Sequence, residues 1–593
     1  MTKFRLRISG RVSAIVLAGA AATAALTLFV ARGESAAPAA RPTPIVISST
    51  VPTELNAANG GAPRATLDQA AAFAWQEFIA LNWPAMTHTT ETPVRDTPDT
   101  SCAFGAIDGR CGSQPLVWET FRGKAEIYTA GARQNYAQPP TYSDVYRLYP
   151  NGIPPCSGAP SASPAWVNLD ETSEIDLNSM YAGVGLPDGI GNNSVPQLIR
   201  FAAKANHVEF NYVTGNPSPT TLPVNTIETK AAWRLLTPTE AASGRFHQQT
   251  VRYYEGTPRT PTAPGNQCYF EATWGLISLH IIQKTQSAPY FIFATFEQAD
   301  NILNAAGQPV EDEDGNVIAP LPASSTTPAT HYQDSSVAPG SAAGPPSVSL
   351  VNPAAGYCTT GPGVRPSSQL YYQNEADTQA VPNAGYICVN FRDHATPPTI
   401  IAANQRAHAA IRVQNPGAPW QYYKLINVQF RPMTKSQPGV PYAGPDAATY
   451  YLANSAVETN TVLQNLSGGL VRYPHYSGRD RTPEIGANSD WASQFPPYPA
   501  PPSRRRNSPR AANGMFYNVR YGASTANYNM GGCMGCHGAA QALGADFSFI
   551  LLLGITDAPD AVPMNTARGV QLDEARFRAL HNPPARRPSP RRR

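Results

Sequence analysis

A pair of alternating apolar runs near the middle of the chain constrains the fold most. Residues 272–285, ATWGLISLHIIQKT, follow the two-residue period of a β-strand. One side carries Trp274, Leu276, Ser278, His280 and Ile282, and the other carries Ile277, Leu279 and Ile281. Residues 289–301, PYFIFATFEQADN, form a second β-rich run after the short link QSAP. We therefore predict a hairpin-like pair of strands within a main sheet-forming region at about 197–300.

Helical patterns occur on both sides of this region. Residues 66–84, TLDQAAAFAWQEFIALNWP, begin with a capping-box pattern at Thr66 and Gln69 and end at Pro84. The Trp and Phe stripe between them is typical of a core helix. Residues 399–412 have a second helical pattern, and residues 384–391 and 422–433 resemble strands. This mixture predicts an α+β fold, with a loop-rich body, an antiparallel β-sheet and several helices.

Size and composition limit the class of protein. A chain of 593 residues exceeds the roughly 250–300 residues at which a single core stops growing, so more than one domain is expected. The 59 prolines indicate many extended loops, and residues 303–350, which lack periodicity, are interpreted as a long surface excursion. The net charge of +3, with only 14% charged residues, gives no reason to expect a nucleic-acid partner.

The N-terminus has the pattern of an export signal. Lys3, Arg5, Arg7 and Arg11 precede an uncharged run from Val12 to Ala31, and small residues follow. Cleavage by a signal peptidase is favoured by the Ala and Gly content, while an uncleaved membrane anchor remains the alternative. We expect a periplasmic or exported protein whose only contact with a membrane is this possible anchor.

Six cysteines precede the C-terminal region, and in an exported protein an even number suggests disulfides. They are Cys102, Cys111, Cys156, Cys268, Cys358 and Cys388. Six thiols allow 15 pairings, among which sequence alone does not choose. The easiest short closures are Cys102 with Cys111 and Cys358 with Cys388, which leaves Cys156 with Cys268.

The motif with the clearest chemistry lies close to the C-terminus. Cys533, Cys536 and His537 form a C-x-x-C-H pattern, in which two thiols attach to haem and the histidine binds iron. A thiol-disulfide exchange motif would need a thioredoxin-like βαβ context, and structural zinc would need a second ligand pair. We find neither pattern. The sequence therefore predicts one covalent haem c with His537 as the proximal iron ligand.

The second axial ligand of the iron is left open by the sequence. Met564 lies in a loop downstream of the motif, and its alternative interpretation is an ordinary loop methionine. His280 lies in an apolar strand and is by default a core histidine. A third possibility is an open iron face that binds a small-molecule ligand.

Several segments together resemble a group of large exported bacterial proteins of the cytochrome c family. They are AWQEFIALNWP, VWETFRGKAEIY, WGLISLHIIQKT with FATFEQADN, YYKLINVQF, LANSAVET and CMGCHGAAQALGADFSFIL, in this order over most of residues 70–552. The resemblance implies haem attachment through Cys533 and Cys536 and iron ligation by His537. It implies no reaction. In the family the LAN…ET segment leads directly into the cysteine motif, whereas residues 460–532 intervene here.

The sequence thus predicts four parts and one principal function. The parts are a signal or anchor with linker at 1–44, the α+β body at 64–465, a Pro- and Arg-rich insert at 466–515, and the haem segment with a basic tail at 516–593, packed on the body. The body is far larger than a bare electron carrier needs. We expect an exported mono-haem cytochrome that transfers electrons with a redox partner protein. The alternatives are a haem enzyme of peroxidase or oxygenase type and a haem-based sensor or binding module.

Overall fold

The computed structural model divides the chain into a short N-terminal unit, Met1–Pro42, and a large unit, Thr43–Arg593. The fold below is that of the large unit. The described residues are 41–87, 93–129, 131, 135–171, 180–182, 197–216, 221–236, 238–301, 311–318, 330–333, 347–350, 386–388, 394–431, 451–454, 457, 533–534, 537, 540 and 545–561. Most of the predicted signal segment, the insert at 466–515, Cys358, Cys536, Met564 and the basic tail lie outside them.

A nine-stranded sheet forms the centre of the large unit. Its main path runs β14 (Tyr423–Gln429), β10 (Ile292–Gln298), β9 (Cys268–Gln283), β7 (Ile227–Arg234), β6 (Gln197–Ala205) and β3 (Arg122–Gly123). All neighbours on this path are antiparallel. Beside it, β8 (Gln248–Glu255) pairs with β9, β4 (Val167–Leu169) is parallel to β8, and β5 (Met180–Ala182) pairs with β6.

The predicted pair of strands is confirmed as β9 and β10, which pair from Ile292 opposite Gln283 to Glu297 opposite Ser278. The connection is the eight residues 284–291, longer than the link QSAP. Strands β6 to β10 fill the region expected to form the main sheet. The α+β class is also confirmed, because helices pack on a largely antiparallel sheet.

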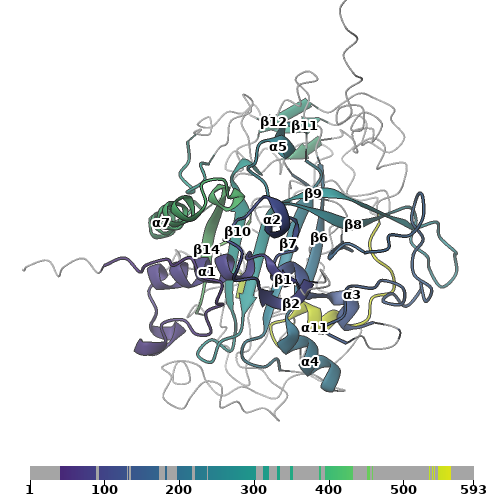
Figure 1. The fold of residues 1–593 in the computed structure, drawn as a ribbon, viewed down its shortest axis with the longest axis horizontal. Coiled ribbons are helices and arrows are strands. Elements are labelled where there is room, and N and C mark those ends of the chain that lie inside the picture. The colour runs from purple at the N-terminus through teal and green to yellow at the C-terminus, as the bar shows by residue number, and fades with distance from the viewer. Residues whose placement is uncertain are drawn as a thin grey trace, which may run out of the picture. The chain divides into compact units, whose positions relative to one another are not determined.

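Two long helices cover one face of this sheet. Helix α1 (Leu67–Leu81) packs on α7 (Pro398–Gln414), and both contact β14, as Figure 1 shows. The Phe78 ring stacks on Phe296 of β10 at 4.2 Å between centroids. Leu279, Ile281, Ala294 and Phe296 are buried on this side, which we call the helix-covered face. Because their side chains alternate with those of the opposite side, the sequence pattern of β9 and β10 is explained.

Helix α1 has the capping box that the sequence predicts. The Thr66 hydroxyl accepts a hydrogen bond from the Gln69 amide at 3.2 Å, and the Gln69 side chain accepts one from the Thr66 amide at 2.9 Å. These bonds satisfy two amides that the first helical turn leaves without intrahelical partners. Trp75, in the middle of α1, donates to the Asn404 side chain of α7 at 2.9 Å.

The remaining elements are short. The helices are α2 (Gly109–Ser113), α3 (Lys124–Ile127), α4 (His207–Gly215), α5 (Pro238–Ala242) and α11 (Phe549–Leu553). One small sheet pairs β1 (Ala85–Thr87) with β2 (Pro93–Pro98), and another has the order β12 (Ser347–Leu350), β11 (Thr330–Gln333), β13 (Tyr386–Cys388). Strands β11 and β12 therefore lie within residues 303–350, for which the sequence predicts only a surface excursion. Short strands of four residues leave little periodicity to detect.

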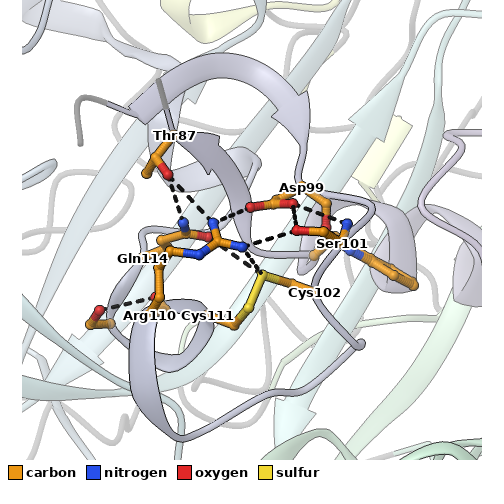
Figure 2. The surroundings of a disulfide bond; sticks show 9 residues. Thr87, Asp99, Ser101, Cys102, Arg110, Cys111 and Gln114 are labelled. Atoms are coloured by element: carbon orange, nitrogen blue, oxygen red, sulfur yellow. Dashed lines mark hydrogen bonds and ion pairs between the residues drawn. A yellow bond between two sulfur atoms is a disulfide. The ribbon is translucent and has the colours of Figure 1, made fainter. Parts of the chain in front are cut away.

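Two of the expected disulfides are present. Cys102 pairs with Cys111 across nine residues, and Cys156 pairs with Cys268, the first residue of β9. Figure 2 shows the first disulfide, where Arg110 pairs with Asp99 and also donates to Ser101. Burial raises the pKa of Asp99, but hydrogen bonds from Ser101 and Arg110 outweigh it and hold that pKa below its usual value.

The disulfides are compatible with an exported protein, because such bonds persist in oxidising compartments. Across the described ranges, which begin after the N-terminal hydrophobic run, no helix has the length and apolar character needed to cross a membrane.

Candidate functional site

The sheet face opposite α1 and α7 carries a row of paired side chains that crosses β14, β10, β9 and β7. Gln429 of β14 lies opposite Phe293 of β10, Phe293 lies opposite Ile282 of β9, and Ile282 lies opposite Glu228 of β7. Directly paired residues of antiparallel strands point to the same face, so these four side chains form one line across the sheet. We call this side, which also carries His280, the polar face.

The described residues between 533 and 549 contact both ends of this line and Phe293 within it. The Met534 amide donates to the Gln429 side chain at 3.0 Å, and Met534 is fully buried. The His537 ring lies 5.0 Å from the ring of Phe293. Farther along the segment, a hydrogen bond from Ser548 reaches Glu228 at the other end of the line. The described residues of the predicted haem segment therefore contact strands that precede them by more than 100 positions.

The described residues of the motif and its surroundings share a helical backbone. Cys533, Met534, His537 and Ala540 have helical backbone conformations. Cys533 and His537 are four residues apart, so they lie on the same face of such a turn. Cys533 is buried, whereas Cys536 lies outside the described residues. The arrangement allows a thioether from Cys533 and a ligand from His537 to serve one ring.

Among the described residues, Phe547, Phe293 and Phe549 hold the His537 ring in position. Its Nδ1 lies 2.8 Å from the carbonyl oxygen of Phe547, and the Phe293 and Phe549 rings each lie 5.0 Å from the imidazole. A carbonyl oxygen only accepts, so Nδ1 carries the proton of the neutral ring and Nε2 carries the lone pair. A metal-binding histidine usually donates its other ring N–H in this way. The described residues thus fit an iron ligand at His537.

A buried ion pair anchors the segment next to Phe547. Asp546 Oδ2 accepts from Lys284 Nζ and from the Leu222 amide, each at 2.9 Å, and both charged side chains are fully buried. Burial raises the pKa of Asp546, although Lys284 counteracts the effect. Phe547, whose carbonyl orients His537, is held in place on one side by this pair.

Two more buried carboxyls lie beside Asp546. Glu209, from α4, and Glu228, from β7, are close enough to shift each other's pKa, and their exposed fractions are 0% and 4%. Burial, together with repulsion by Glu228, raises the pKa of Glu209 well above its usual value. Burial raises the pKa of Glu228 to about 7, despite hydrogen bonds from Ser548 and Glu209. In Figure 1 the yellow C-terminal segment with α11 lies near α4.

The two candidates for the distal ligand have different positions. His280 lies on the polar face, opposite Thr295 of β10 and Lys230 of β7. It is therefore two residues along β9 from Ile282, the cross-strand neighbour of Phe293, which contacts His537. Met564 lies outside the described residues. The identity of the distal ligand thus stays a prediction, with His280 on the same side of the sheet as His537.

No sequence pattern predicts that Glu209, Glu228, Lys284 or Asp546 belongs to a site. Each is an ordinary charged residue in its local context, and their separation along the chain hides their proximity. The only local signal is Asp546 within the GADFSFIL segment that resembles the cytochrome family. Among the described residues, which exclude Cys536, no group of three or more His, Cys, Asp or Glu is arranged to hold a metal ion.

Comparisons with known proteins add no assignment. No protein-family model, curated protein or solved structure matches the chain.

Proposed function

We propose that the protein is an exported mono-haem c-type cytochrome that transfers electrons to or from a redox partner, and that it works in the periplasm. The observation that carries the proposal is the 2.8 Å contact between His537 Nδ1 and the Phe547 carbonyl, within a C-x-x-C-H motif. That contact selects the ring tautomer in which Nε2 can bind iron. The two disulfides support export.

Each residue of the site has a defined task in this proposal. Cys533 and Cys536 would hold the haem through thioether bonds, and His537 would supply the proximal nitrogen. The haem supplies a one-electron couple when it is bound. The Phe547 carbonyl keeps the proton on Nδ1, while Phe293 and Phe549 shield the imidazole from water. The sheet beneath the segment gives these groups a rigid support.

Covalent haem attachment can be tested directly. The protein is produced by export in a bacterium with a c-type maturation system, denatured, and stained for haem in a gel. We expect staining of the wild type and none of Cys533→Ala with Cys536→Ala. The control, Cys102→Ala with Cys111→Ala, also removes two cysteines and should retain the stain. Staining of the Cys533/Cys536 variant, or no stain in the wild type, would refute the proposal.

The coordination of the iron separates electron transfer from the alternatives. A ferric protein with a six-coordinate low-spin spectrum, unchanged by cyanide, is expected for an electron carrier. His280→Ala should convert this spectrum to high spin if His280 is the distal ligand, with His394→Ala as a control at a histidine that stacks on Tyr451. A high-spin wild type with turnover of peroxide would instead establish the haem enzyme.

A further inference from the structure

We propose that Glu209 and Glu228 form a proton-binding pair that takes up one proton when the site beside it is reduced. The inference rests on the proposed function, because the electron enters at the haem of Cys533, Cys536 and His537. The glutamate pair takes its proton from solvent, and the haem takes its electron from a one-electron donor protein.

Hydrogen-bond donors are scarce around the pair in the part of the chain that the structure describes. Apart from the Glu228 carboxyl, the described residues offer no donor to either oxygen of Glu209, and Oε1 of Glu228 also lacks one. Two carboxylates only accept hydrogen bonds, so a bond between them requires a proton on one of them. Because both side chains are buried, two negative charges here would be strongly unfavourable. The pair therefore holds at least one proton near neutral pH.

The described charged groups around the pair do not neutralise it. Asp546 repels a negative charge on either carboxyl, and Lys284 is engaged by Asp546 at 2.9 Å. The cationic and histidine side chains near α4 contact other groups. Arg122 pairs with Glu126, Lys124 with Glu171 and His207 with Asp96, and Lys204 donates to backbone carbonyls. In the described surroundings, the proton is thus the means by which the pair loses its excess negative charge.

The pair is physically connected with His537 through residues 546–548. Asp546 and Ser548 flank Phe547, whose carbonyl accepts from His537 Nδ1. Asp546 is tied to Lys284, and Ser548 hydrogen bonds to Glu228 while its hydroxyl also caps α11 by accepting from the Leu551 amide at 2.8 Å. Loss of the proton from the pair changes the charge next to both flanking residues. The pair and the imidazole are therefore coupled through three consecutive residues.

The direction of the coupling between reduction of the haem site and proton binding by the pair follows from charge. Reduction removes one positive charge from the site, so a neighbouring carboxyl binds a proton more tightly in the reduced protein. By reciprocity, protonation favours reduction. The midpoint potential should then fall as the pH rises through the range around 7 in which Glu228 titrates.

The test measures the midpoint potential by spectroelectrochemistry between pH 5 and 9. We expect the wild type to lose potential with rising pH and Glu228→Gln, and Glu209→Gln with Glu228→Gln, to lose this dependence. The control Glu77→Gln removes another buried carboxyl, on α1 at the opposite sheet face, and should keep the wild-type dependence. Asp546→Asn provides a second variant, which should move the dependence to lower pH because a repelling charge is gone.

A second readout needs no haem. Infrared spectra of the wild type should show the carbonyl band of a protonated carboxyl that disappears between pH 5 and 9, and Glu228→Gln should lack this change. A potential independent of pH in the haem-loaded wild type, or an unchanged dependence in Glu228→Gln, overturns the redox link alone. The absence of covalent haem overturns the proposed function and with it the link, and the infrared change would then show only a shared proton.

Discussion

The two faces of the main sheet use the same strands but are stabilised in different ways. On the helix-covered face, aromatic rings of α1 pack on Phe296, and Trp75 finds its hydrogen-bond partner on α7. On the polar face, a segment from the end of the chain is held by Gln429, by the Lys284–Asp546 pair and by Glu228. Along β9, neighbouring residues such as Ile281 and Ile282 belong to different faces.

This difference between the two faces predicts that the stability of each face depends on pH to a different extent. Packing of apolar side chains stabilises a structure over a wide range of pH, whereas buried carboxyls make it depend on their protonation. Helix α1 does carry one buried carboxyl, Glu77, and burial raises its pKa well above the usual value. The polar face differs because three carboxyls and a lysine gather around Asp546, next to Phe547, whose carbonyl contacts His537.

The largest effect is expected on the helix-covered face. Phe78→Ala removes a ring that is fully buried against Phe296 and Trp420, and such truncations cost about 3–5 kcal/mol. Urea unfolding should show this loss. Val413→Ala, at an exposed position of α7, should change the free energy of unfolding by less than about 0.5 kcal/mol. A loss of under about 1 kcal/mol for Phe78→Ala would mean that α1 does not pack there.

The next largest loss of stability is expected when a substitution breaks the ion pair of the polar face. Lys284→Met leaves Asp546 buried without its cation, and removal of one partner of such a pair costs about 3–5 kcal/mol. We expect the lower end near neutral pH, since the raised pKa lets Asp546 accept a proton. Urea unfolding of Lys284→Met, Asp546→Asn and the double variant measures the coupling. Additive losses from the two single variants would show that the pair does not interact.

A third prediction concerns the pH dependence of stability. The pKa of Glu228 is about 7 in the folded protein against an ordinary 4.5, so the folded state holds this proton more tightly than the unfolded state. Its contribution to stability is complete below about pH 4 and declines as the pH rises to about 7, by on the order of 2–3 kcal/mol. Glu228→Gln should reduce this decline in urea unfolding curves from pH 4 to 8. An identical decline in the variant would assign it to other groups.

The smallest effect is local to α1. Thr66→Ala removes the hydroxyl that accepts from the Gln69 amide and should cost about 1 kcal/mol. Thr66→Ser retains the acceptor and should stay within about 0.5 kcal/mol of the wild type. Equal losses in the two variants, measured by urea unfolding, would show that the cap contributes nothing.

Local sequence signals predicted the parts whose causes are local. The capping box of Thr66 and Gln69 depends on residues three apart, and the β9–β10 pair depends on alternation along each strand. The Cys102–Cys111 closure spans nine residues. The strands β11 and β12 were missed because four residues carry too little periodicity, and the connection after β9 proved longer than expected.

By itself, the sequence determined the α+β class, the principal helices and strands, and the Cys533, Cys536 and His537 motif with its predicted haem. Only the tertiary structure decided that Phe547 orients His537 and that Glu209, Glu228 and Asp546 lie together. The physical reason is distance along the chain. Periodicity, capping and short motifs act over a few residues, whereas His537 and Phe547 are ten residues apart and Asp546 is more than 300 positions from both glutamates. The burial and repulsion that shift a pKa arise only when folding brings such residues together.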